Sequence, residues 1–343
     1  MIDLRSDTLT QPTAPMLEAM RNATFGDDSR DGDQTVQRLE AMAAARTGKE
    51  AGAFMPSGTM TNLVAMLAHG NRGGEVLLEN GSHTLNAELG GVASVAGLFY
   101  RGIPGQRGAM DLDCLHDSIR PMTRHNMGTA LIWLENTHNR AGGAVLPLAH
   151  MEAVRRLARE NGIPVHLDGA RLFNAAIALG VNSADIARHA DTVCFCVSKG
   201  LSAPIGSILC GDRKFIERAR SYRRMVGGNL RQAGPLAAAG IVALETMVDR
   251  LAEDHRSAKR LAQALHRIDA GLCDPQDVQT NLVRVDTSAS GRRAAQWSAD
   301  LEAKGLRVSP ADMHVLRFVT HRHVTVADVD TAAGLFASLW KRH

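Results

Sequence analysis

Lys199 is the residue with the clearest potential for covalent chemistry. It follows a nearly continuous apolar run at 192–197, which is typical of a strand buried on both faces of a sheet. A turn rich in Gly and Pro comes next, and a second apolar run at 205–210 leaves it. Burial makes an ammonium ion costly, and a neutral lysine amine can form a Schiff base with a carbonyl compound. A surface lysine at a strand end would give the same pattern, so both interpretations remain open here.

A second candidate is an anion site at residues 56–59, Pro-Ser-Gly-Thr. These residues follow a short apolar strand predicted at 51–55 and precede a helix that continues through Leu67. Free backbone N–H groups and hydroxyls at a helix N-terminus bind anions, phosphate above all. Because Ser and Thr are also the ordinary N-cap residues, a plain helix start explains the pattern too. The Gly-Lys-Ser/Thr ending of a Walker loop is missing.

Two polar side chains follow predicted strands, and a third lies within one. His83 comes just after the apolar run 76–78, where its ring could stack on a planar cofactor or simply lie on the surface. Asp168 ends the run 164–167, where a carboxylate could bind a metal, a ribose or a protonated ring nitrogen. Right-handed crossovers would bring Asp168 and Lys199 to one sheet edge. Arg317 lies in a half-buried strand, where an arginine usually has a carboxylate partner.

The elements that must position these residues form two patterns. Strands and helices alternate up to residue 211, as expected for a doubly wound, mostly parallel sheet. From about residue 249 a long helix at 251–268 leads to strands at 280–285 and 315–320 and to a terminal helix at 326–340. We therefore expect an α/β fold in which residues 1–248 form an N-terminal arm and a large domain. Residues 249–343 would form a smaller α+β domain.

The overall composition argues against several classes of protein. The chain has 343 residues, of which 45% are hydrophobic and 22% charged, and its net charge is +3. A net charge so close to zero disfavours nucleic acid or a membrane surface as a partner. No His or Cys residues have the spacing of metal ligands, so no metal site is predicted. The arginines of the helix predicted at 215–225 are interpreted as a solvated or inter-subunit face. Five cysteines without a pairing pattern, and acids where a signal peptide would be basic, favour a cytoplasmic location.

An anion cradle, a stackable imidazole, a carboxylate, a lysine and an arginine together match what pyridoxal 5'-phosphate and an amino-acid substrate require. Motifs in family order across nearly the whole chain carry a resemblance: IDLRSDTLTQP at 2–12, PSGTM at 56–60, ENTHNR at 135–140, HLDGARLFNA at 166–175, SKGLSAPIG at 198–206, RQAG at 231–234 and RFVTH at 317–321. The chain resembles the low-specificity L-threonine aldolases, which are fold type I, aspartate-aminotransferase-like pyridoxal enzymes. Serine hydroxymethyltransferases share this fold but place a histidine where Arg171 stands, so the aldolase branch fits better.

The resemblance implies a role for each matching position. Lys199 would form the Schiff base, Asp168 would pair with the pyridine nitrogen, and His83 would stack on the ring. The phosphate would be held by Ser57, Gly58 and Thr59, and Arg171 would also contact the cofactor. The substrate carboxylate would be held by Ser6, Arg171 and Arg317, and His125 would lie near the substrate β-hydroxyl.

The resemblance also implies a reaction and an assembly. A β-hydroxy-α-amino acid such as L-threonine or L-allo-threonine would lose its β-hydroxyl proton, its Cα–Cβ bond would break, and glycine and an aldehyde would form. Family members are homotetramers whose active sites are built across a dimer interface, so a homo-oligomer is expected. A β-eliminating or dehydrating pyridoxal lyase is the alternative. A non-catalytic pyridoxal-binding regulator is disfavoured, because the lysine is present and no segment is left for a DNA-binding module.

The chain departs from the family pattern around the substrate side chain. Arg30 replaces the usual tyrosine of the 27–33 loop, and the family's bulky aromatics after His83 are replaced by Thr84, Leu85, Asn86 and Ala87. Farther on, Arg224 replaces a lysine and Asn229 replaces a glycine. A wider, more cationic pocket with Arg30 near the substrate would suit an anionic substrate such as 3-hydroxyaspartate, or a bulky aryl-serine. Neutral drift with ordinary threonine cleavage is the other interpretation.

Overall fold

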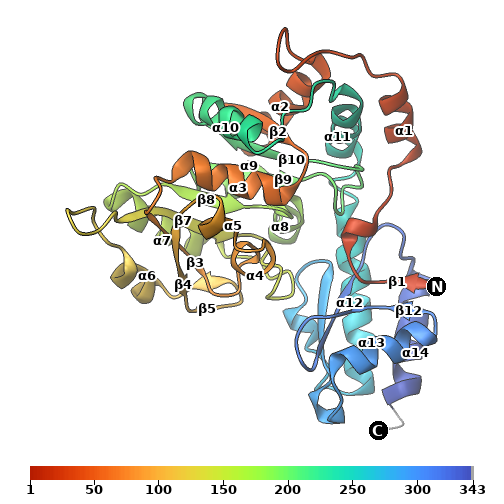
Figure 1. The fold of residues 1–343 in the computed structure, drawn as a ribbon. Helices are drawn as coiled ribbons and strands as arrows, with labels where there is room; N and C mark the ends of the chain where they lie inside the picture. Colours follow the sequence, from red (N-terminus) through yellow and green to blue (C-terminus); the bar gives the residue numbers. More distant parts are fainter. Residues whose placement is uncertain (341–343) are drawn as a thin grey trace.

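The computed structural model describes residues 1–340, and its centre is a seven-stranded sheet (Figure 1). Its strands lie in the order β2 (Ala51–Met55), β10 (Ser207–Gly211), β9 (Thr192–Cys196), β8 (Val165–Asp168), β7 (Thr129–Glu135), β3 (Glu75–Glu79) and β4 (Phe99–Ile103). Within this sheet β10 runs antiparallel to both of its neighbours, and every other neighbouring pair is parallel. The expected α/β fold with a mostly parallel sheet is confirmed.

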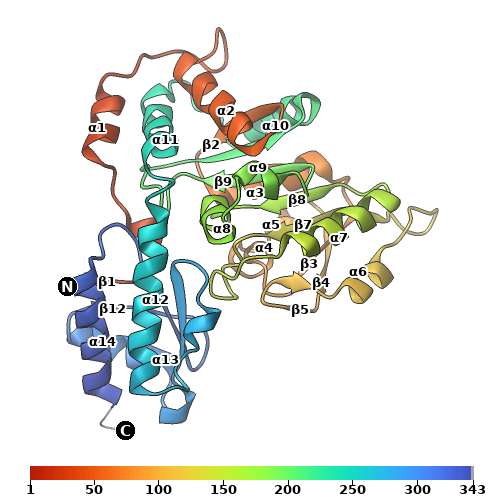
Figure 2. The same ribbon diagram turned by 180° about the vertical axis from the view of Figure 1, so that it is seen from behind.

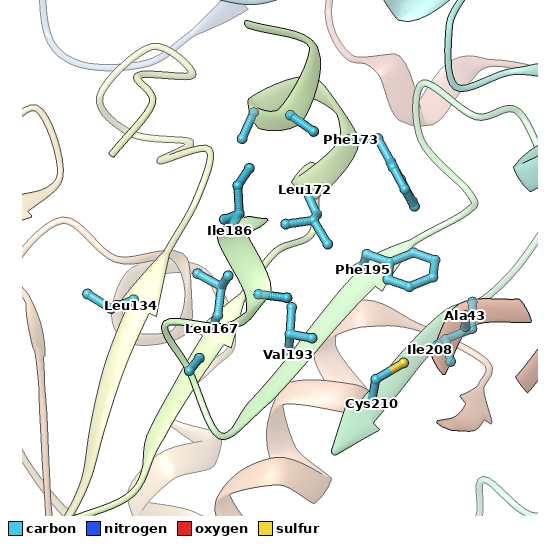
Figure 3. Close-up of a cluster of buried hydrophobic side chains, with 14 of the residues drawn as sticks. Ala43, Leu134, Leu167, Leu172, Phe173, Ile186, Val193, Phe195, Ile208 and Cys210 are labelled. Carbon is cyan, nitrogen blue, oxygen red and sulfur yellow. The ribbon is translucent and has the colours of Figure 1, made fainter. Parts of the chain in front are cut away.

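Helices cover both faces of this sheet, because the strands bury side chains on both (Figures 1 and 2). One face packs against α3 (Gly58–His69), α5 (Gly91–Ser94) and α10 (Arg213–Met225). The other packs against α2 (Gln34–Thr47), α7 (Leu148–Glu160), α8 (Leu172–Leu179), α9 (Ser183–Ala187) and α11 (Gly234–Thr246). Along β9, Cys194 points to the first face and Phe195 to the second, where it packs edge-on against Phe173 of α8 (Figure 3).

The crossovers bring the carboxyl ends of three central strands to one edge. Glu135 ends β7, Asp168 ends β8 in register with it, and Lys199 follows the end of β9. Two helices, α8 and α9, separate β8 from β9. The expected meeting of Asp168 and Lys199 at one edge of the sheet is confirmed.

The C-terminal region has its own core around Trp297, Phe318 and Phe336. A small antiparallel sheet of β11 (Leu282–Asp286), β14 (Val315–Val319) and β13 (Ser309–Pro310) packs with α12 (Leu251–Ile268), α13 (Ala294–Ala303) and α14 (Val326–Trp340). The first residues of the chain join this region, since β1 (Ile2–Asp3) pairs with β12 (Leu306–Arg307) and Leu4 lies in its core. The division between residues 248 and 249 stays a prediction.

The remaining short elements connect these parts. They are η1 (Asp7–Leu9), α1 (Ala14–Arg21), α4 (His83–Ala87), β5 (Gly105–Gln106), β6 (Ala109–Met110), α6 (Leu112–Ser118), η2 (Pro275–Asp277) and η3 (Ser288–Ser290). In residues 1–340, no helix is both long enough and apolar enough to cross a lipid bilayer.

Candidate active site

A cavity of about 420 Å³ lies at the carboxyl ends of β7, β8 and β9. We call it the main cavity. It is lined by most of the residues that the sequence predicted for the site: Ser6, Ser57, Gly58, Thr59, His83, Asp168, Arg171, Lys199 and Arg317. The N-terminal arm, the large sheet and the C-terminal region each contribute to this wall. The structure therefore gathers an amine, a carboxylate, an imidazole and two guanidinium groups around one space.

The start of α3 forms the anion cradle of the main cavity. Ser57 is the N-cap, and its Oγ accepts a hydrogen bond of 3.2 Å from the backbone N–H of Met60. Among the described residues no hydrogen bond is recorded for the backbone N–H groups of Gly58 and Thr59, which carry the positive end of the helix dipole. A Cβ on Gly58 would lie 2.9 Å from Cys196 Sγ, so glycine permits the close approach to the end of β9. A phosphate fits this cradle.

Asp168 is held by neutral donors at the bottom of the main cavity. Asn62 Nδ2 donates 2.8 Å hydrogen bonds to Asp168 Oδ2 and to Glu88 Oε1, and the Ala170 N–H donates to Asp168 Oδ1 at 3.0 Å. No cation among the described residues forms an ion pair with this buried carboxylate. A buried carboxylate is stabilised by a positive charge, which a protonated pyridine nitrogen would supply. Asp168 therefore fits the cofactor role predicted for it.

Glu88 orients His83 on the wall of the main cavity. His83 Nδ1 lies 2.8 Å from Glu88 Oε1, and the backbone N–H of His83 donates to Glu135 Oε2 at 2.6 Å. The hydrogen bond to Glu88 raises the pKa of His83 above its ordinary value of 6.5, although burial opposes it. The network from Asp168 through Asn62 and Glu88 to His83 thus fixes both groups that would flank the cofactor ring.

We expect the raised pKa of His83 to give a pH-dependent stability that requires Glu88. The stabilisation is complete below the unfolded pKa of about 6.5 and is lost as the pH rises through the higher folded pKa. Glu88→Gln should flatten this part of the curve of unfolding free energy against pH, measured by urea denaturation from pH 5.5 to 8.5. Glu302→Gln, at a surface pair with Arg307, is the control and should keep the wild-type curve. Parallel curves for Glu88→Gln and the wild type would contradict the assignment.

The two arginines of the main cavity differ in how their charge is compensated. Arg171 donates two 2.7 Å hydrogen bonds to Asp7, and the side chains of this pair are 6% and 0% exposed. Burial alone would raise the pKa of Asp7, but the guanidinium of Arg171 holds it well below its usual range. Among the described residues, Arg317 donates hydrogen bonds only to the Asn139 side chain and the Arg5 carbonyl oxygen, and its buried Nε has no hydrogen-bond partner. Arg317 is therefore the better suited of the two to hold a substrate carboxylate.

Removing the charge of Asp7 should strongly destabilise the fold. Asp7→Asn leaves the Arg171 guanidinium buried without a counter-charge, which typically costs ~3–5 kcal/mol of unfolding free energy. Guanidinium chloride denaturation at pH 7 measures this loss. The surface pair of Glu302 and Arg307 is the matched comparison, and Glu302→Gln should have a much smaller effect. Equal effects of the two substitutions would refute a stabilising role of the Asp7–Arg171 pair.

Two predicted substrate residues lie outside the main cavity of their own chain. His125 belongs to an exposed loop before β7, at the amino end of the strand, whereas the cavity lies at its carboxyl end. Its Nε2 accepts a 2.8 Å hydrogen bond from Arg124 Nε. The side chain of Arg30 is 80% exposed and faces Asp27. A single chain does not bring these two side chains to the cofactor residues, and their predicted roles at the substrate stay predictions.

Sequence reasoning missed several side chains that line or support the main cavity, among them Asp7, Asn62, Glu88 and Asn139. Asn62 has a detectable signal, because it lies four residues after Gly58 and so shares its helix face. Glu135 also has a detectable signal in the sequence, because it ends the apolar run that forms β7. Its buried carboxylate accepts hydrogen bonds from the backbone N–H groups of His83 and Asn139, and burial raises its pKa. Thr137 also lines the cavity with a buried hydroxyl that has no hydrogen-bond partner.

The chain is similar to known proteins over most of its length. The model of the beta-eliminating lyase family matches residues 3–288. A low-specificity L-threonine aldolase of Escherichia coli is 40% identical, with 95% of each chain covered, and that of Arabidopsis thaliana is 39% identical, covering 98% of this chain and 95% of the relative. An alanine racemase of Cochliobolus carbonum is 31% identical over 99% of this chain and 87% of its own.

The fold comparison covers the whole molecule. A solved structure of threonine aldolase from Leishmania major superimposes with a TM-score of 0.83, at 17% identity and with 99% of each chain covered. An aspartate aminotransferase of Thermus thermophilus has a TM-score of 0.75, so the fold is that of the fold type I pyridoxal enzymes. The chain belongs to the beta-eliminating lyase family, within which its similarity to the low-specificity L-threonine aldolases extends over nearly its full length.

Proposed function

We propose that this protein is a pyridoxal 5'-phosphate-dependent aldolase that cleaves a β-hydroxy-α-amino acid to glycine and an aldehyde. One observation carries the proposal: a single cavity combines Lys199, Asp168, the free start of α3 and the uncompensated Arg317. These are the groups that a phosphate, a pyridine nitrogen, an aldehyde and an amino-acid carboxylate need. The family and its relatives make the same activity the expected one.

The cofactor, when bound, would supply an electron sink for the pair of electrons released from the breaking Cα–Cβ bond. The residues of this chain would hold and orient the reacting groups. The start of α3 would bind the phosphate, Asp168 would keep the ring nitrogen protonated, and Lys199 would bind the aldehyde carbon. Arg317 would fix the α-carboxylate, which sets the direction of the Cβ substituent.

His83 is better suited to orient the ring than to remove the β-hydroxyl proton. A general base must be unprotonated, whereas Glu88 stabilises the protonated imidazole of His83. Water, or the exposed His125 of a second copy of the chain, would then accept the proton. The active sites would be completed in a homo-oligomer, as the family resemblance implies. This is supported by the exposed side chains of Phe25 and Leu89, on the segments that precede Arg30 and follow His83. The cytoplasmic location stays a prediction.

Product analysis tests the proposed reaction. Purified protein with added pyridoxal 5'-phosphate and L-threonine or L-allo-threonine should release glycine and acetaldehyde in equal amounts, as quantified by chromatography and an alcohol dehydrogenase assay. Ammonia and 2-oxobutyrate instead would identify a dehydrating lyase. Inversion at Cα without cleavage would identify a racemase. Either result would replace the aldolase proposal.

A further inference from the structure

A second cavity of about 190 Å³ lies beside the main cavity. We call it the side cavity. His83, Asn139 and Arg317 line both cavities, so the two cavities meet at these side chains. The other walls include Ala87, which follows His83 by one turn of α4, and Arg140 and Arg284. An amino acid whose α-carboxylate is held by Arg317 therefore has space for its Cβ substituent beside these arginines.

Arg140 and Arg284 share a single carboxylate. Arg284 Nη2 donates to Asp312 Oδ2 at 2.8 Å, and Arg140 Nη2 donates to Asp312 Oδ1 at 3.2 Å. The hydrogen bond from Arg284 holds the pKa of Asp312 below its usual range. Arg284 Nη1 also donates to the Arg140 carbonyl oxygen at 2.8 Å, and Arg140 Nη1 donates to Asn86 Oδ1 at 3.1 Å. These contacts position two guanidinium groups at the side cavity with one negative charge between them.

The charge of the side cavity favours an anion. Glu79, another acid near Arg140, lies 2.9 Å from His138 Nε2. Burial raises the pKa of Glu79, and His138 lowers it more strongly than the charge of Arg140 does. Among the described residues, Arg317 forms no ion pair with a carboxylate. Burial and the guanidinium groups of Arg171 and Arg284 lower its pKa, and the charge of Asp7, which pairs with Arg171, opposes them. Arg140, Arg284 and Arg317 together therefore carry two positive charges beyond what Asp312 compensates. A substrate with two carboxylates would neutralise both, whereas threonine would neutralise one.

We propose that the substrate class of this enzyme is the β-hydroxy-α-amino dicarboxylic acids, whose second carboxylate binds Arg284 and Arg140 in the side cavity. The inference rests on the proposed aldolase activity. For 3-hydroxyaspartate, the β-hydroxyl loses its proton and its oxygen becomes the aldehyde oxygen as the Cα–Cβ bond breaks. The electron pair of that bond stays with Cα and takes up a proton, so the products are glycine and glyoxylate. The small side chain of Ala87 leaves room for the second carboxylate in the side cavity. The planar guanidinium groups of Arg140 and Arg284 would bind that carboxylate through their N–H groups.

Substrate competition tests the proposal. The kcat/KM of the holoenzyme should be at least tenfold higher for 3-hydroxyaspartate than for threonine or phenylserine, with all four stereoisomers of each assayed as glycine release. Arg284→Met should lower the hydroxyaspartate-to-threonine ratio of kcat/KM by roughly tenfold to a hundredfold, the usual weight of a hydrogen bond to a charged group. Arg260→Met is the matched control, because Arg260 pairs with Asp330 at the surface of the C-terminal region, and should keep the wild-type ratio.

A binding measurement separates this inference from the aldolase proposal. Aspartate and 2-aminobutyrate carry no β-hydroxyl, so neither can undergo retro-aldol cleavage. Their dissociation constants, from calorimetry with the holoenzyme, should favour aspartate, and Arg284→Met should remove the preference. Cleavage of threonine without any preference for hydroxyaspartate or aspartate would overturn the dicarboxylate proposal and leave the aldolase intact. A preference for phenylserine would overturn it in favour of an apolar occupant. Tight binding of aspartate with no cleavage of any substrate would overturn the aldolase instead.

Discussion

Replacing Lys199 with alanine should lower the rate of glycine formation by roughly a thousandfold or more, the scale on which loss of a covalent nucleophile acts. Lys199 lines the main cavity beyond the end of β9, and its backbone carbonyl oxygen accepts a 2.7 Å hydrogen bond from Thr10 Oγ1. The substitution by alanine removes the side-chain amine and leaves the strand, the turn and this backbone hydrogen bond in place. Single-turnover and steady-state assays with the best substrate measure the loss.

An exposed lysine provides the control for this experiment. Lys214 lies near the start of α10, outside the main cavity, so Lys214→Ala should keep the wild-type rate. Circular dichroism and the melting temperature of Lys199→Ala should match those of the wild type. A correctly folded Lys199→Ala variant with more than a tenth of the wild-type rate would show that the lysine is not the covalent residue.

Asp168→Asn should be the second most damaging change, with a fall in kcat of roughly a hundredfold to a thousandfold. The amide keeps the size of the carboxyl group but lacks the negative charge that would hold the cofactor's ring nitrogen protonated. Asn62 Nδ2 and the Ala170 N–H now donate to different oxygens of Asp168, so the single amide oxygen of Asp168→Asn can keep only one of these two hydrogen bonds. Because the phosphate cradle and Lys199 are untouched, binding of pyridoxal 5'-phosphate should weaken far less than kcat falls. Steady-state kinetics measure kcat, and a fluorescence titration measures the dissociation constant of the cofactor.

The surface variant Asp300→Asn is the matched control, since Asp300 pairs with Arg292 away from the main cavity and should leave kcat unchanged. If Asp168→Asn weakens the cofactor affinity and kcat by the same factor, Asp168 contributes binding alone. A wild-type kcat would remove it from the site altogether.

The sheet that carries the site is predictable because its central strands are buried on both faces. Runs such as those of β7 and β9 are almost continuously apolar, so composition alone identifies them, and the βα alternation then brings their carboxyl ends together. The edge strand β4 escapes this reasoning. Phe99 and Tyr100 are exposed there, and Arg101 pairs with Glu75 across to β3, so the segment has no buried pattern.

The residues of the site also divide into those that the sequence can locate and those that it cannot. Lys199, Asp168 and the Ser57–Gly58–Thr59 turn follow strands directly, and a strand end is a position that sequence can locate. Glu88 and Asn62 act through hydrogen bonds that span different elements, and Asp7 meets Arg171 across more than 160 residues of chain. No local pattern encodes such long-range contacts. His125 and Arg30 were assigned from resemblance alone, and the fold of one chain places them elsewhere.

The site of covalent cofactor attachment tests the account most directly. Protein loaded with pyridoxal 5'-phosphate would be reduced with sodium borohydride, which makes a carbon–nitrogen double bond permanent, and digested for mass spectrometry. We expect the cofactor's mass on the peptide containing Lys199, at close to one per chain. The label should be absent from peptides containing Lys49, Lys214, Lys259 and Lys304. A label on another lysine, or an unlabelled Lys199 peptide, would contradict the assignment of the main cavity as a pyridoxal site.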